Sequence, residues 1–283
     1  MARKKKTAAE TGPPVDPAAP STLITPGPAA VRRLGKNAPK LDARTLKLAR
    51  YLKPELPTPP DSTDYTNLET DWGMMQNDRL GCCTIAAVAH AIQTWTLVIN
   101  QRITVPDSVV VDYYSKWDGY VAGDASTDNG GVELDVLNQW RKSPDGFNGH
   151  PLLAYADPDP GDVLHVKQAI SLFGGIYIGI ALPITAQAQM DRGDPWDVVS
   201  HGGFDTQPNS WGGHAVWCPK YDATGITCIT WGKLQRMTWD FWAAYCDESH
   251  ALLSSDFVVP GTGLAPSGFD VATLQDDLQS VTG

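Results

Sequence analysis

The longest apolar stretch of the sequence is CTIAAVAHAIQTWTLVI at residues 83–99, which has almost no polar face. Such a pattern predicts a helix that is buried on most of its sides. Three shorter helices are predicted at residues 108–117, 132–140 and 163–173. The first of these follows Pro106 and Asp107, and Asp107 is predicted to be its N-cap.

The second half of the sequence has a different pattern. IYIGIAL at residues 176–182 is rich in β-branched and aromatic residues, which favours a strand. Residues 214–221 and 226–232 are two apolar runs around the short turn DATG, and this arrangement predicts a hairpin. Helices followed by strands are typical of an α+β fold with two packed halves, one helical and one an antiparallel sheet.

The chain is predicted to have three parts. Residues 1–53 are rich in Pro, Ala and Gly and form an extended N-terminal arm with a short basic helix at 41–52. Residues 54–250 form the globular domain, and residues 251–283 form a C-terminal strap with a short helix at 270–281. No apolar stretch approaches the roughly 20 residues of a membrane span. The basic start lacks a hydrophobic run, so we expect no secretory signal and a location in the cytoplasm or in a phage particle.

Charge is divided unevenly between these parts. Residues 1–53 hold 12 Lys and Arg against 3 Asp and Glu, a net of +9, whereas the remaining residues carry −19. A basic arm on an acidic body predicts docking on an acidic partner protein, on nucleic acid or on another copy of the body. A solvated leader is the alternative. Nucleic acid is the weak candidate, because the arm has no aromatic residues between its charges.

Cysteine and histidine spacing excludes several site types. Five cysteines without a CxxC pair predict neither a disulfide framework nor a zinc ribbon, although a single bridge between Cys218 and Cys228 across the hairpin stays open. The six histidines include no HExxH motif. The acidic run DPDPGD at 157–162 lacks the ligand spacing of a calcium loop and predicts a turn with Asp162 as a helix cap. We therefore expect no metal and no cofactor.

One cysteine occupies a position that suits nucleophilic catalysis. Cys83 follows the glycine-containing loop QNDRLGC and opens the buried helix, where the helix dipole favours a thiolate. His214 lies 131 residues later, at the start of the predicted hairpin. A thiol beside an imidazole is the arrangement that nucleophilic thiol catalysis requires.

Six segments surround these two residues between positions 64 and 250: NDRLGCC, PDSVVVDYYSKW, DNGG, VKQAISLFGGIYIGIAL, HAVWCPKY and ITWG. Taken in this order, they resemble the papain-like cysteine peptidase superfamily. The resemblance implies a two-lobed α+β fold, Cys83 as nucleophile and His214 as base. It also implies that Gly130, Gly131 and Gly213 bind an extended substrate. The Cys-to-His spacing agrees with this family.

Two positions depart from the family pattern. The oxyanion glutamine is expected six residues before the nucleophile, where Asn77 precedes Cys83, while Gln76 stands six before Cys82. Asn77 or Gln76 is therefore expected to supply the side-chain donor. Thr230 takes the place of the asparagine that orients the imidazole when 16 residues are counted from His214, and Ile229 does when Trp-Gly is aligned. Thr230 can still accept a hydrogen bond. Asn209, in an NSWG sequence before the histidine, is an alternative partner.

These features support two functional hypotheses. The first is a cysteine peptidase or amidase that acts on peptide or protein substrates through Cys83 and His214. The second is a catalytically weak or inactive structural subunit of a large assembly such as a phage particle, anchored by its basic arm. The split charge and the missing asparagine favour the second, and the ordered series of motifs favours the first.

Overall fold

The computed structural model describes residues 31–40, 42, 57–67, 69–268 and 270. The helices predicted at 41–52 and 270–281 lie outside these residues, apart from their members 42 and 270. The α-helices described are α2 (Cys83–Val98), α3 (Asp107–Asp118), α4 (Glu133–Lys142), α5 (Val163–Phe173), α6 (Ile184–Arg192) and α7 (Trp239–Tyr245). The strands are β1 (Thr63–Asp64), β2 (Leu152–Ala156), β3 (Ile176–Leu182), β4 (Gly212–Asp222), β5 (Gly225–Thr230), β6 (Lys233–Thr238) and β7 (Cys246–Ser254).

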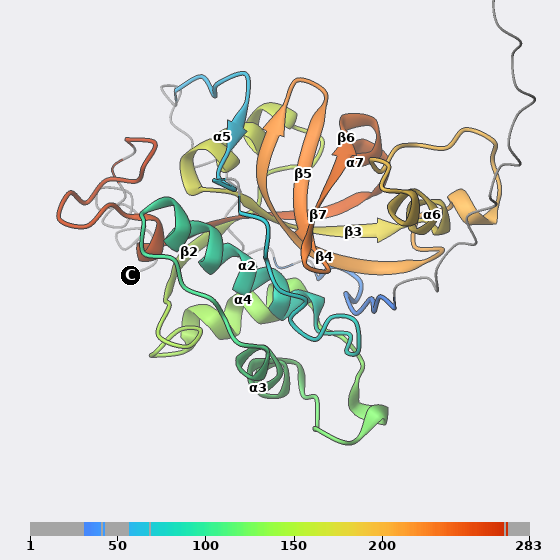
Figure 1. Cartoon of the computed structure of the whole chain (residues 1–283), viewed down its shortest axis with the longest axis horizontal. Coiled ribbons are helices and arrows are strands. Elements are labelled where there is room, and N and C mark those ends of the chain that lie inside the picture. The colour runs from blue at the N-terminus through green and yellow to red at the C-terminus, as the bar shows by residue number, and fades with distance from the viewer. Residues whose placement is uncertain (1–30, 41, 43–56, 68, 269, 271–283) are drawn as a thin grey trace, which may run out of the picture.

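The strands form one antiparallel sheet. Their order is β2-β7-β3-β4-β5-β6, and the short β1 pairs with β4. β3 lies between β4 and β7, and its all but completely buried IYIGIAL sequence suits this central position. In the register of β3 and β4, Ile180 is opposite His214. The strongly curved sheet and the helices α2, α3 and α4 form the two halves of the molecule (Figure 1).

Helix α2 joins the two halves. Residues from Cys83 to Thr96 are all buried, as the apolar pattern predicts, and the helix packs on β4. The rings of Trp95 and Trp217 meet edge to face with centroids 5.3 Å apart, and the Trp95 Nε1–H donates to the carbonyl of Phe173 at 2.7 Å. This packing fixes the C-terminal part of α2 against the sheet. The predicted α+β architecture with a helical half and a sheet half is confirmed.

Several boundaries differ from the sequence predictions. Asp107 is the first residue of α3, and Pro106, with extended φ −66° and ψ 146°, takes the N-cap position. The prediction that Asp107 is the cap is wrong because proline already has the backbone angles of a helix entry. The open question of a bridge between Cys218 and Cys228 is settled, since all five cysteines are free. No helix among the described residues is long and apolar enough to cross a membrane.

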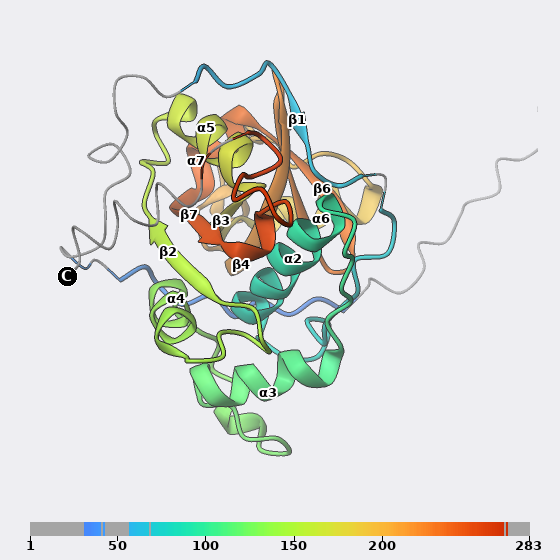
Figure 2. The ribbon, with the colours of Figure 1, turned by 90° about the vertical axis from the view of Figure 1, so that its left-hand side faces the viewer.

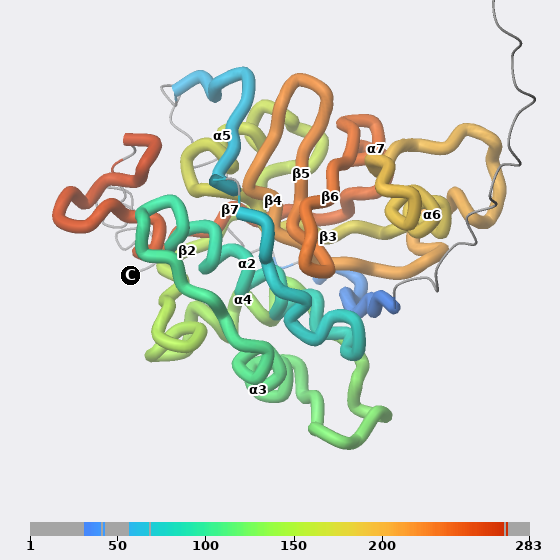
Figure 3. The backbone as a smooth tube through the Cα atoms, in the orientation of Figure 1, coloured from blue at the N-terminus to red at the C-terminus, as the bar shows by residue number. Residues whose placement is uncertain are grey.

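The described part of the N-terminal arm, residues 31–40, passes between the two halves. Figure 2 shows this segment running between the helices below and the sheet above. Figure 3 traces its path near the bottom of β4. It pairs with the helical half at Gly131 and with the sheet half at Gly213. This described segment of the arm therefore contacts the body of the same chain.

Candidate active site

Cys83 lies at the first position of α2, where the preceding loop turns sharply into the helix. Met75 and Gln76 in this loop have left-handed backbone angles, with φ 53° and 61°. Such angles are uncommon for residues other than glycine, so surrounding contacts must hold them. One such contact binds the loop near its end, where the Gly81 N–H donates to the Asp128 carboxylate at 2.9 Å.

Asp128 links this loop to the Gly130–Gly131 pair. Its Oδ1 accepts from the Gly81 N–H and from the Tyr114 hydroxyl at 2.7 Å, and that hydroxyl accepts from the Gly130 N–H at 2.9 Å. The network therefore fixes the glycine pair relative to the start of α2. The sequence signal was the Asp before Asn-Gly-Gly, but its partners lie 14 and 47 residues away.

His214 lies on β4, where it is paired with Ile180 of the central strand β3. Its Nε2 lies 2.7 Å from Thr230 Oγ1, and its buried Nδ1 has no hydrogen-bond partner among the described residues. The Trp231 ring stacks on the imidazole at 4.1 Å and 6°. Trp231 holds this position with a left-handed φ of 44°. The hydroxyl and the indole thus fix the ring, whereas Asn209 is exposed and its backbone N–H donates to Ala181.

Burial keeps Cys83 and His214 uncharged in this structure. The Cys83 side chain belongs to a residue only 1% exposed, and its burial raises the thiol pKa to about 12, although backbone groups of Ala215 and Gly35 oppose the rise. Burial lowers the pKa of His214 to about 3. A thiolate–imidazolium pair is therefore disfavoured while the site is covered.

The two candidate oxyanion donors point in different directions. Gln76 donates through Nε2 to Asp107 at 2.6 Å, away from α2. Asn77 is buried, and its Nδ2 donates to the carbonyls of Leu80 at 3.0 Å and Arg33 at 3.4 Å. The Arg33 carbonyl also accepts from Trp231 Nε1 at 3.3 Å. Side-chain N–H groups from both halves thus converge on one carbonyl of the arm.

Residues 33–37 of the arm bind as an extended backbone. Lys36 is paired in parallel with Gly131. The Gly131 N–H donates to Gly35 and its carbonyl accepts from Asn37, both at 2.8 Å. The Lys36 N–H donates to Gly213 at 3.1 Å. The three glycines expected to bind substrate therefore lie against a peptide chain.

Glycine is required where this backbone approaches most closely. A Cβ on Gly130 would lie 1.9 Å from the Gly35 carbonyl oxygen, and a Cβ on Gly213 would lie 2.2 Å from that of Lys36. Both contacts are with backbone, which cannot move aside as a flexible side chain can. Any residue with a side chain at these positions would push an extended peptide out of the site.

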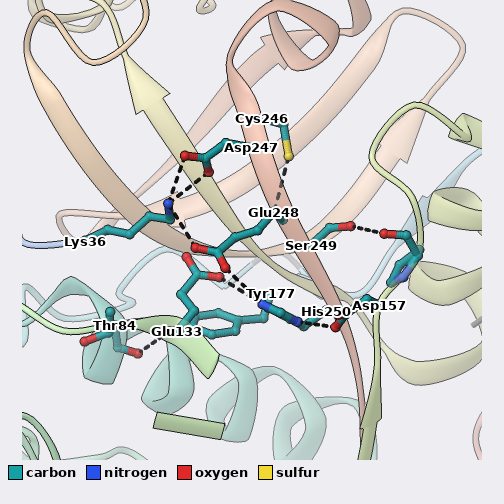
Figure 4. A network of polar contacts seen from close by, with 11 residues as sticks. Lys36, Thr84, Glu133, Asp157, Tyr177, Cys246, Asp247, Glu248, Ser249 and His250 are labelled. Carbon is teal, nitrogen blue, oxygen red and sulfur yellow. Dashed lines mark hydrogen bonds and ion pairs between the residues drawn. The ribbon is translucent and has the colours of Figure 1, made fainter. Parts of the chain in front are cut away.

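A buried acidic cluster receives the Lys36 side chain (Figure 4). The ammonium lies 2.9 Å from both Asp247 and Glu248 on β7, and the side chain is 1% exposed. Glu133, Glu248 and His250 also bring their ligand atoms within 4.8 Å of one another, a spacing that could hold a metal ion. Lys36 supplies the cation at this cluster. No local sequence pattern indicated this cluster, because its members come from distant segments.

Comparisons with solved structures agree with this architecture. Xylellain, a cysteine protease from Xylella fastidiosa, superposes with a TM-score of 0.57 and 17% identity, over 82% of this chain and 98% of its own. ProCathepsin B S9 from Trypanosoma congolense gives a TM-score of 0.51 and 11% identity, over 80% of this chain and 88% of its own. No family model matches the sequence, and the comparison with curated proteins gave no match. The fold is papain-like.

Proposed function

We propose that this chain is a cysteine peptidase that cleaves peptide or protein substrates, and that residues 33–37 hold it in a closed state. One observation carries the proposal: an extended peptide backbone is bound over Cys83 by Gly131 and Gly213 from opposite halves. The backbone of Gly35 lies against Gly81, two residues before Cys83, and it lowers the pKa of the Cys83 thiol against the larger opposite effect of burial. A cleft that binds a peptide main chain across a thiol suits peptide-bond cleavage.

The proposed chemistry uses Cys83 as the nucleophile. The Cys83 sulfur attacks the substrate carbonyl while His214 Nδ1 takes the thiol proton, and the same imidazole then returns it to the leaving amine. The resulting thioester is hydrolysed by water, which restores the thiol. Thr230 accepts from Nε2–H and selects the tautomer in which Nδ1 is a free base.

The developing oxyanion needs preorganised donors. The backbone N–H of Cys83, at the start of α2, and the buried Asn77 amide are the proposed pair. Asn77 already donates to a carbonyl of the bound arm, which supports it over Gln76.

Arm withdrawal is the proposed activating step. Solvent would then reach the thiol and the imidazole, which would bring their pKa values back toward 9.0 and 6.5 and make proton transfer between them easier. The neutral pair seen in the covered site is consistent with a resting form.

Digestion of denatured casein by the full-length chain tests the proposal. The assay compares the chain with a Gly35→Ala variant, in which a Cβ would overlap the Gly81 carbonyl at 1.8 Å and displace the arm. We expect peptide release from the variant, and its loss when Cys83→Ser is added but not when Cys246→Ser is added. Absence of peptides although iodoacetamide reaches Cys83 would show that the fold has no peptidase activity.

A further inference from the structure

The Lys36 side chain enters a pocket between the start of α4 and strand β7. Glu133 is the first residue of α4, and Asp247, Glu248 and His250 follow one another closely on β7. Figure 4 shows the Lys36 ammonium pointing at the carboxylates of Asp247 and Glu248, with the Glu133 carboxylate beside that of Glu248. We call this the lysine pocket.

The pocket contains more negative charge than its own residues balance. Glu133 is fully buried, and neither of its oxygens has a hydrogen-bond partner among the described residues. Its nearest cation on the body is His250 Nε2 at 3.7 Å, and His250 also contacts Asp157 at 2.6 Å and Glu248 at 3.5 Å. Buried carboxylates without a counter-charge are strongly unfavourable. Burial raises the pKa of Glu133, so this carboxyl can be neutral, whereas Asp247 and Glu248 lose their ammonium partner once Lys36 leaves. A cation from outside the body would restore that partner.

The shape of the pocket suits a long unbranched side chain. Gly179 on β3 forms one wall, and a Cβ there would lie 2.0 Å from Lys36 Cε. The methylene stem passes over this glycine, and the charged end reaches the carboxylates. Leu or Phe would fill the entrance but leave the carboxylates unpaired, so the pocket selects by charge as well as by length.

The lysine pocket is adjacent to the reacting thiol. Gly35 lies against Gly81, two residues before Cys83, since a Cβ on Gly35 would lie 1.8 Å from the Gly81 carbonyl oxygen, and Lys36 is the next residue along the bound chain. We propose that the lysine pocket is the specificity subsite of the enzyme and takes a Lys or Arg side chain next to the substrate residue that lies over Cys83. This inference rests on the proposed function and names its substrate class: basic peptides.

Peptide turnover by a full-length chain with a vacated pocket tests the inference. The variant carries Gly35→Ala and Lys36→Met, which remove the backbone fit and the charge of the arm. Its substrates are fluorogenic peptides with Lys, Arg or norleucine at each position beside the scissile bond. At one position we expect kcat/KM to be higher for Lys or Arg than for norleucine by about tenfold or more. Equal values at every position would overturn the inference.

A charge-neutral variant locates the preference. Glu248→Gln should remove most of the Lys advantage, measured as the ratio of kcat/KM for Lys to that for norleucine. Asp112→Asn on the exposed face of α3 is the matched control and should leave this ratio unchanged. If Glu248→Gln does not fold, Asp247→Asn replaces it, because that side chain is 31% exposed at the rim. A Lys advantage that persists in the folded variant, whether Glu248→Gln or Asp247→Asn, would refute the proposal.

A binding measurement separates this inference from the proposed function. If the vacated variant cleaves no peptide, the peptidase proposal fails, and fluorescence anisotropy on its Cys83→Ala form then tests the pocket. The probes are a peptide of residues 31–40 and the same peptide with norleucine for Lys36. Tighter binding of the lysine peptide by about tenfold supports a cation pocket. Equal affinity for the two peptides overturns the inference. A variant that binds the lysine peptide more tightly but cleaves Lys and norleucine substrates equally well also overturns it.

Discussion

Replacing Gly35 by Ala should open the site without changing any charge. A Cβ at this position would lie 1.8 Å from the Gly81 carbonyl oxygen, where ordinary contacts begin at 3.4 Å. The clash is with the backbone of the loop that Asp128 holds, so the arm must move and the loop stays. The matched control is Gly161→Ala, where a Cβ meets only the side chain of Asp159 at 3.2 Å.

The size of the effect follows from the contacts that would be lost. Four main-chain hydrogen bonds join residues 33–37 to the body, at 2.8 to 3.1 Å. At about 1 kcal/mol each they contribute about 4 kcal/mol. Since 1.4 kcal/mol is a factor of ten, their loss raises the open population by about a thousandfold.

Iodoacetamide labelling measures this opening at Cys83. The closed thiol, with its pKa near 12, should react slowly at pH 7.5, and the variant should be labelled at least about a hundredfold faster. Quantitative mass spectrometry of all cysteines provides an internal check, because Cys218 and Cys228 stay buried unless the chain unfolds. Slow labelling of Cys83 in a folded Gly35→Ala variant, equal to that in Gly161→Ala, would refute the account of the arm.

Three further predictions concern the surrounding network. Thr230→Ala should lower kcat by about tenfold to a hundredfold with little change in KM, because the imidazole loses its hydroxyl partner. Thr230→Ser keeps the hydroxyl and should keep the activity, and steady-state kinetics of both variants in the Gly35→Ala background test this difference. Asp128→Ala should lower the free energy of unfolding by about 2–3 kcal/mol in urea titrations, since it leaves two donors unpaired. Burial lowers the pKa of His250, but its carboxylate partners outweigh burial and raise this pKa from 6.5 to about 10. Protonated His250 therefore stabilises the fold below pH 6.5, and this stabilisation is lost as the pH rises through 10. His250→Gln should reduce the difference in unfolding free energy between urea titrations at pH 6.5 and 10.5, and an unchanged difference would contradict the assignment.

Local pattern was sufficient for much of the fold. The apolar run at 83–99 and the helix and strand at 163–182 have strong, uninterrupted periodicities, and the structure has α2, α5 and β3 there. β7 was not predicted, because Cys-Asp-Glu-Ser-His is polar and its burial depends on partners from β2 and β3. β7 also extends past residue 250, where the sequence suggested the end of the domain.

The candidate site divides in the same way. Thr230 could be placed near His214 by counting along a familiar hairpin, and it lies 2.7 Å from the imidazole. The lysine pocket could not be found by counting, because Lys36, Glu133 and Glu248 are separated by about a hundred residues each. Their meeting depends on the path of the arm, which no local pattern encodes.

The arm that crosses the cleft belongs to the same chain as Cys83, so closure is a unimolecular event. Its local concentration is set by the tether and does not fall on dilution, unlike that of a separate inhibitor. In the proposed peptidase, a substrate would therefore compete with a tethered segment whose local concentration is constant. The fraction of open molecules should be the same at nanomolar and micromolar protein, which makes removal or remodelling of the arm, and not the abundance of the protein, the variable that sets activity.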